Sequence, residues 1–177
     1  MNLSFYDGQS ITLSQMLDAK EQRVTRQRQA IQQYHLPLIS LTLVIPGEIK
    51  KSSAADYLFT QALIAINRYL EQQHITIVKQ ITSTLTTGNE AIIVVDSLAT
   101  ELKNYCIHIE DHHPLGRLWD IDVIDPVTQQ SLSRTTTTSP RLCLVCQQLA
   151  KNCSRSRNHS VADVLQVMNH IISTYQC

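Results

Sequence analysis

The sequence lacks any apolar run long enough to cross a membrane, and its first residues lack the basic-then-apolar pattern of a secretory signal. We therefore predict a cytoplasmic protein without a membrane anchor. Fifteen basic and fifteen acidic side chains cancel. There is thus no bulk attraction to nucleic acid or to an anionic membrane, and any anion site must be local. Internal repeats and low-complexity linkers are absent as well, which favours a single domain over residues 1–177.

Cysteines are few, and three of the five lie close together near the C-terminal end. With no export signal, a metal site or free thiols fit this odd set better than disulfides do. The spacing Cys143-Leu-Val-Cys146, followed by Cys153 and His159, supplies the four ligands of a closed tetrahedral zinc site. Such a site would be structural, because protein atoms fill all four positions. The alternative is three reduced thiols on an amphipathic helix beside a surface histidine.

The order of helix and strand signals predicts an α+β fold. Thr12-Leu-Ser-Gln15 resembles a capping box and opens a helix that runs to about Tyr34. Further helices are expected over residues 53–70, 97–104 and from 141 onward, apart from a Cys-rich bend. Strands are expected over residues 39–45, 75–85, 91–95, 105–110 and 117–125, with a further pairing at 131–133. The order αβαββ(α)ββαα gives a mixed or antiparallel sheet with packed helices and a Cys-rich helical segment over residues 140–177.

The first predicted helix has two distinct sides. Apolar residues share one of them, as in an amphipathic helix: Leu13, Leu17, Val24 and Ile31. Basic residues follow another line along the helix: Lys20, Arg23, Arg26 and Arg28. A basic series of this kind is typical of a solvated face, and the alternative is a docking patch for an acidic partner.

Asp120 and Asp122 stand at alternate positions between Trp119, Ile121 and Val123. Apolar residues at every second position predict a half-buried strand, so both carboxylates should point to the same face, about 7 Å apart at the backbone. At that separation they can converge on one or two divalent ions, magnesium or manganese, which prefer hard oxygen ligands and bridge to substrate phosphates. The pattern indicates transfer of a phosphorus-centred group. The alternative is a strand whose polar face is merely solvated.

Residues just before the two aspartates also suit phosphate chemistry. Gly116 would allow a phosphate to approach the backbone closely, and Arg117 would supply a bidentate partner. His113 is a candidate general base because imidazole titrates near neutral pH, although loop histidines are more often simply exposed.

Two other segments carry candidate anion contacts. Ile45-Pro-Gly-Glu-Ile-Lys50 joins a predicted strand to a helix, where backbone N–H groups and the helix dipole can cradle an anion. Gly47 would form the turn and Lys50 would add a point charge. The segment lacks the Walker pattern, so an ordinary turn is the alternative. Arg155 and Arg157, near the cysteines, are further candidates.

Motifs spread along nearly the whole chain share one family pattern. They are Arg23 with Arg26 and Gln27, residues 45–50, Thr87-Gly88, Glu110, residues 113–123, Ser133-Arg134, residues 140–146 and residues 153–159. In order and spacing they resemble the apo-citrate lyase phosphoribosyl-dephospho-CoA transferases, also called holo-citrate lyase acyl carrier protein synthases. The stretch at 116–123 and the Cys-rich tail are specific. Val44 departs from the pattern, which usually has Asn before Ile-Pro-Gly.

The resemblance implies a nucleotidyltransferase-like enzyme. It would move the prosthetic group of 2′-(5″-triphosphoribosyl)-3′-dephospho-CoA to a serine of the citrate lyase acyl carrier protein (gamma) subunit, forming a phosphodiester and releasing diphosphate. The residues themselves, and not the resemblance, suggest catalytic roles for Asp120, Asp122, Arg117 and His113, with Mg²⁺ on the two aspartates. Substrate contacts would come from Gly47, Lys50, Gly116, Arg134, Arg155 and Arg157. The alternatives are the transferase for the malonate decarboxylase acyl carrier protein and a non-catalytic zinc-binding adaptor.

Overall fold

Four antiparallel strands form a sheet in the order β2-β3-β1-β4 within the N-terminal part of the protein. The computed structural model describes residues 3–134 and 141–176. The chain divides into two compact units, Met1–Ser133 and Arg134–Cys177. The first unit holds the sheet, and the second holds the Cys-rich segment, whose predicted first residue, Pro140, lies outside the described residues. The predicted α+β class is confirmed.

The elements follow the chain in nearly the predicted order. The first unit contains, in sequence, α1 (Leu13–Tyr34), β1 (Leu38–Leu43), α2 (Ser53–Gln72), β2 (Thr76–Leu85), β3 (Gly88–Asp96), α3 (Ala99–His112), the short 3₁₀ helix η1 (Gly116–Leu118) and β4 (Trp119–Ile124). The second unit contains α4 (Ala150–Ser156) and α5 (Val161–Gln176). Within the described ranges, no helix is both long and apolar enough to cross a membrane.

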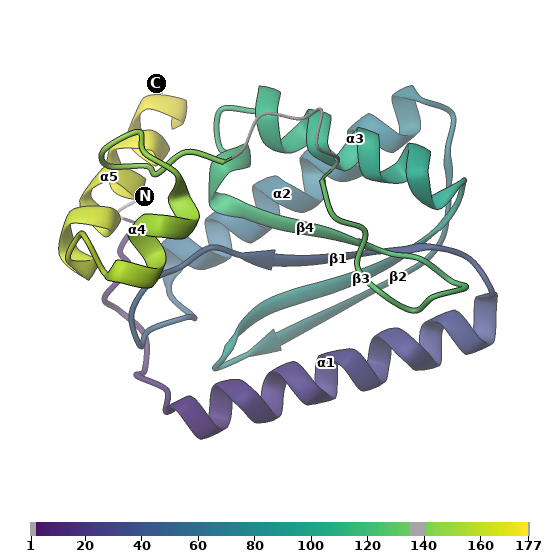
Figure 1. Ribbon diagram of the computed structural model, residues 1–177, viewed down its shortest axis with the longest axis horizontal. Helices are drawn as coiled ribbons and strands as arrows, with labels where there is room; N and C mark the ends of the chain where they lie inside the picture. Colours follow the sequence, from purple (N-terminus) through teal and green to yellow (C-terminus); the bar gives the residue numbers. More distant parts are fainter. Residues whose placement is uncertain (1–2, 135–140, 177) are drawn as a thin grey trace. The chain divides into compact units, whose positions relative to one another are not determined.

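Helices cover both faces of the sheet in the first unit (Figure 1). α1 lies along one face, in contact with β1 and β3, whereas α2 and α3 pack on the other face. The core on the α2 side includes the fully buried Trp119, whose indole N–H donates to the Leu58 carbonyl at 3.1 Å. Under α1, Ala30 and Ile31 pack on an apolar patch of the sheet that includes Leu38 and Val94. The sheet thus has one apolar face and one face that is only partly apolar.

α1 begins as predicted, but it turns a different side to the sheet. Thr12 and Gln15 form the capping box, in which each side chain accepts a hydrogen bond from the other's backbone N–H, at 3.2 and 2.8 Å. The prediction for the apolar side is wrong for Leu13, Leu17 and Val24, which are 75%, 50% and 41% exposed. The helix instead buries small residues and turns arginines inward, because a buried carboxylate on the sheet needs them, as described below.

The segment at residues 105–110, predicted as a strand, belongs to α3. Its neighbourhood has buried residues at Leu102, Cys106 and Ile109, and this three- and four-residue spacing is that of a helix face. Tyr105, Ile107 and Ile109 have a local strand preference, and the packing of the whole helix on β4 overrides it. The predicted pairing after β4 is present as one antiparallel bridge between Ile124 and Ser131.

Candidate functional site

β4 presents a buried face and a polar face. Trp119, Ile121 and Val123 are buried, and the two aspartates alternate with them on the opposite side. β4 pairs with β1 so that Asp120 lies opposite Thr42. The alternation read from the sequence therefore places Asp120 and Asp122 on one face, as predicted.

A cavity of about 170 Å³ lies between α1 and the sheet, and Asp120 lines it. Its walls come from α1, from the β1 strand and the segment after it, from the start of β3, and from β4. The charged side chains that line it are Lys20, Arg23, Lys50, Glu90 and Asp120. Three cations and two carboxylates thus share one small space, which suits an anionic ligand.

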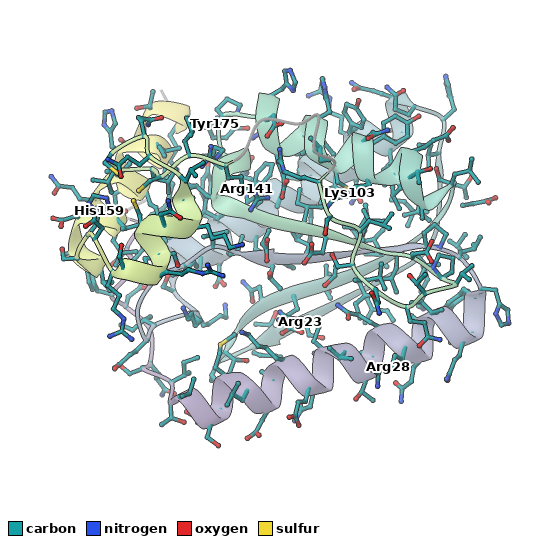
Figure 2. The ribbon with its side chains drawn as sticks, in the orientation of Figure 1. Arg23, Arg28, Lys103, Arg141, His159 and Tyr175 are labelled. Atoms are coloured by element: carbon teal, nitrogen blue, oxygen red, sulfur yellow. The ribbon has the colours of Figure 1, made fainter. Side chains whose placement is uncertain are left out.

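Glu90 is a buried carboxylate in the wall of this cavity, and the sequence prediction missed it. Its side chain is 6% exposed and accepts from Arg23 at 3.2 Å and from Arg26 at 2.5 Å, so two guanidinium groups neutralise one carboxylate. Figure 2 shows Arg23 extending from α1 toward the sheet. Next to this pair, Gln27 donates to the Ser40 hydroxyl at 2.8 Å. Arg23 and Arg26 are therefore not part of a solvated face, whereas Lys20 and Arg28 of the same basic series are exposed.

Lys50 reaches the cavity from the loop between β1 and α2. Its ammonium donates to the Ile45 carbonyl, and burial, together with the nearby charge of Lys20, lowers its pKa below the ordinary value. Among the described residues, no carboxylate forms an ion pair with Lys50. Lys50 is therefore a half-buried cation in the cavity that forms no ion pair with the part of the chain that the structure describes.

The two aspartates of β4 have different surroundings. The Thr42 hydroxyl donates to Asp120 Oδ2 at 3.3 Å, at the edge of the cavity. Asp122 does not line the cavity; its Oδ1 accepts from the Ser131 hydroxyl at 2.9 Å and lies 4.0 Å from the ammonium of Lys103. Lys103 is itself buried on α3 (Figure 2). Asp120 thus lines the cavity, and Asp122 does not.

The start of α2 does not offer the anion cradle that the sequence suggested. Gly47 has a positive φ of 81°, as its turn requires, but a further five residues separate it from the first residue of the helix. The N–H groups of Ser53, Ala54 and Ala55 already donate to the Asp7 carboxylate, the Ser4 carbonyl and the Ser52 hydroxyl. The contribution of this loop to the cavity is the Lys50 side chain.

Gly116 and His113 lie away from the cavity. A Cβ on Gly116 would come within 2.5 Å of the Glu110 carbonyl oxygen, so glycine is needed where η1 packs on the end of α3. The His113 ring lies against Trp119, at 4.5 Å between centroids, and burial lowers its pKa. Its Nδ1 accepts from the Leu115 N–H at 3.1 Å, so the neutral ring carries its proton on Nε2. This makes His113 a poor general base.

The predicted arginines fall in different parts of the chain. Arg117 is in η1, directly before β4, and is half-buried. Arg134 is the first residue of the second unit. Arg155 is in the last turn of α4, and Arg157 follows as its C-cap in a left-handed conformation, with φ at 50°. Both Arg155 and Arg157 are exposed.

The second unit brings the predicted zinc ligands together. One ligand atom from each of Cys143, Cys146, Cys153 and His159 lies within 4.8 Å of all the others, and this group could hold a metal ion. The Cys146 and Cys153 sulfurs are 3.4 Å apart. His159 Nε2 is buried and has no hydrogen-bond partner among the described residues. A buried nitrogen usually has a hydrogen-bond partner, so His159 Nε2 is suited to bind an ion instead. Together with the three sulfurs it would complete a tetrahedral site.

The loop between the first two cysteines has the geometry of a metal-binding knuckle. Leu142 and Leu149 form an antiparallel bridge, and the Cys143 N–H donates to the Gln148 carbonyl. Burial raises the pKa of Cys143, but the N–H groups of Cys146 and Val145 donate to its sulfur and bring this pKa below the ordinary value. Backbone N–H groups aimed at a sulfur favour the thiolate, the form that binds metal.

Comparisons with known proteins identify the family of this chain. Residues 11–175 match the sequence model of the family described as apo-citrate lyase phosphoribosyl-dephospho-CoA transferase. The chain belongs to this family. It is therefore an enzyme of the transferase type, and the resemblance read from its motifs is confirmed.

Similar proteins cover the chain almost completely. The chain is 31% identical over 169 residues to the apo-citrate lyase phosphoribosyl-dephospho-CoA transferase of Escherichia coli O1:K1 / APEC, covering 96% of this chain and 92% of that protein. It is 32% identical over 164 residues to the protein of the same name from Shigella boydii serotype 18, covering 93% and 90%. It is 38% identical over 170 residues to Protein CitXG of Haemophilus influenzae, covering 96% of this chain but 36% of that longer protein.

Proposed function

We propose that this transferase attaches the prosthetic group of triphosphoribosyl-dephospho-CoA to a serine of the citrate lyase acyl carrier protein. In this reaction the serine oxygen bonds to the α-phosphorus, and the bond from that phosphorus to the β-phosphate oxygen breaks. Diphosphate leaves and the hydroxyl proton passes to solvent, so a phosphodiester remains. The observation that carries the proposal is a family match over residues 11–175 in a chain whose cavity combines a strand carboxylate with cations.

Asp120 is the proposed ligand of Mg²⁺ in the cavity. Its carboxylate is a hard oxygen donor beside Thr42, and one or two protein carboxylates plus substrate phosphates are the usual set for this ion. Mg²⁺ bound there would neutralise charge on the departing diphosphate. Asp122 is proposed as a supporting residue, since Lys103 and Ser131 already engage its carboxylate.

The rest of the substrate needs contacts outside the cavity. A pocket that encloses a drug-sized ligand has a volume of roughly 300–1,000 Å³, whereas this cavity has about 170 Å³. It accommodates one end of a dephospho-CoA derivative, and we propose that this is the polyphosphate end. Within the first unit, Arg117 is kept as a proposed contact for the remaining phosphates. Arg134, Arg155 and Arg157 belong to the second unit and stay predictions from the sequence.

In the second unit, we propose that the Cys143, Cys146, Cys153 and His159 group binds zinc in a structural role. Three sulfurs and an imidazole form a soft ligand set that suits Zn²⁺ far better than Mg²⁺. All four positions would be filled by protein atoms, which leaves none for a substrate. This proposal does not depend on the reaction assigned to the first unit.

The reaction is tested by measuring the mass of the carrier protein. Apo-citrate lyase acyl carrier protein is incubated with the enzyme, triphosphoribosyl-dephospho-CoA and Mg²⁺, and intact mass spectrometry follows the products. We expect the mass of one phosphoribosyl-dephospho-CoA group to be added, with one diphosphate released per modified carrier. An unchanged carrier mass with active precursor would overturn the proposal and favour the zinc-binding adaptor.

A parallel incubation separates the two carrier proteins. With apo-malonate decarboxylase acyl carrier protein in place of the citrate lyase subunit, we expect little modification at equal concentrations. Faster modification of the malonate decarboxylase carrier would assign the enzyme to that partner, with the same chemistry.

A further inference from the structure

The cavity under α1 contains more positive charge than its own carboxylates neutralise. Glu90 is fully engaged by Arg23 and by Arg26. This leaves the ammonium groups of Lys50 and Lys20 with the carboxylate of Asp120 in the same space. Placing two cations close together in a partly buried site is unfavourable unless an anion offsets them.

Lys50 shows this imbalance most clearly. Its ammonium is half-buried, donates to the Ile45 backbone carbonyl, and has no ion-pair partner among the described residues. Lys51, its neighbour in the chain, pairs instead with Asp56. Buried ammonium groups are normally paired with a carboxylate or neutralised by a pKa shift. The unmatched charge is therefore available to a ligand.

The wall around Lys50 favours a compact anion over an aromatic group. Gly88, at the start of β3, lies against Lys50: a Cβ on this glycine would be 3.6 Å from Lys50 Cβ. No aromatic side chain is among the described residues that line the cavity, so a base has nothing there on which to stack. Phosphate oxygens are strong acceptors for lysine, which binds them as a point charge.

We propose that Lys50, with Lys20 at the exposed edge of the cavity, binds the β- and γ-phosphates of the substrate and holds them as the departing diphosphate. This inference rests on the proposed function and adds the residues that bind the leaving group. Asp120, the proposed Mg²⁺ ligand, lines the same cavity. The leaving group would then be bound beside the cation that offsets its charge. Lys50 thus contacts the reacting group and contributes to both binding and rate.

The test measures binding of inorganic triphosphate, without precursor or carrier protein, by isothermal titration calorimetry in the presence of Mg²⁺. We compare the wild type with Lys50→Met, Lys50→Arg and Lys20→Gln, and with Lys79→Gln as a control on the exposed part of β2. Loss of one charge-assisted hydrogen bond should weaken binding about tenfold or more in Lys50→Met. Lys20→Gln should weaken it less, because Lys20 is exposed. Lys50→Arg, which keeps the charge, should bind more tightly than Lys50→Met, and Lys79→Gln should match the wild type.

The inference is overturned if Lys50→Met binds triphosphate as tightly as the wild type, or if the wild type shows no binding at about 1 mM ligand. Thermal unfolding of each variant, compared with the wild type, checks that the fold is retained. The carrier-mass assay keeps this result separate from the reaction proposal. Triphosphate binding that depends on Lys50 supports the anion site even if no carrier is modified, and Lys50-independent binding refutes it even if the carrier is modified.

Discussion

The two groups of ligand residues in this protein differ in how complete they are. In the second unit, three cysteines and His159 bring four ligand atoms within 4.8 Å of one another. In the first unit, Asp120 alone of the β4 pair lines the cavity, with cations around it. A closed set of four soft ligands is typical of a structural ion, whereas a single hard ligand in an open cavity needs substrate oxygens to complete it. The first unit thus suits the proposed ion that takes part in the reaction, and the second suits the proposed ion that stabilises the fold.

Chelation tests most directly whether the two proposed metal sites differ in how readily they lose their ion. We expect a brief treatment with EDTA to reduce transfer more than about 100-fold, because an ion held by Asp120 exchanges freely, and added Mg²⁺ to restore it. The closed Cys₃His site should retain about one zinc per chain over the same period. Carrier mass and metal content are measured on the same samples. Full transfer activity in the presence of EDTA would contradict the open site.

Substitution of the histidine ligand tests the closed site. His159→Gln should lower the zinc content from about one equivalent to below about 0.3, because three thiolates alone leave one position open. Hydrogen exchange in residues 141–176 should become faster at the same time. His170→Gln, an exposed histidine on α5, is the matched control and should leave both unchanged. Equal zinc content in the two variants would show that His159 is not a ligand.

The ion pairs of Glu90 with Arg23 and Arg26, between α1 and the sheet, should be essential for stability. Glu90→Gln leaves Arg23 and Arg26 without their buried counter-charge, and loss of one partner of a buried ion pair costs about 3 kcal/mol in the free energy of unfolding. Urea unfolding measures the change, with Glu21→Gln on the exposed side of α1 as control. A loss no larger than that of the control would show that Glu90 does not hold the helix to the sheet.

Asp122→Asn tests whether Asp122 holds the ion, as is proposed for Asp120. Asparagine can still accept from Ser131 but no longer attracts Lys103 by charge, so we expect transfer to fall less than about tenfold. The rate is measured at saturating precursor. A loss as large as that from substitution of Asp120 would mean that both carboxylates hold the ion.

The smallest effect concerns pH. Burial lowers the pKa of His113 below its ordinary 6.5, so the folded protein keeps this ring neutral where the unfolded chain protonates it. Unfolding then takes up a proton, and stability should decrease as the pH falls from about 6.5 toward the folded pKa. His113→Gln should flatten the dependence of the unfolding midpoint on pH in this window. An unchanged slope would mean that His113 does not titrate differently on folding.

Local patterns in the sequence predicted much of this structure. The capping box at Thr12 and Gln15, the alternation around Asp120, and the Cys-x-x-Cys spacing each depend on residues a few positions apart. Such features are set by backbone periodicity, which the sequence carries directly.

Features that depend on tertiary packing could not be predicted in the same way. The side that α1 turns to the sheet is decided by Glu90, which lies 67 positions from Arg23. One signal was present: Glu90 directly precedes the buried run at residues 91–95, and a carboxylate there requires cations. The segment at 105–110 was predicted as a strand because Tyr105, Ile107 and Ile109 have a local strand preference, and only the packing of the helix on β4 overrides it.

The central claim is that Asp120, in the cavity under α1, is where transfer takes place. It is tested most directly by following the intact mass of apo-citrate lyase acyl carrier protein with wild type and Asp120→Asn side by side, with Asp18→Asn on exposed α1 as control. The account predicts full modification by wild type and Asp18→Asn, and less than about one hundredth of that rate by Asp120→Asn, which should keep its fold. Modification by Asp120→Asn at more than about a tenth of the wild-type rate would contradict it.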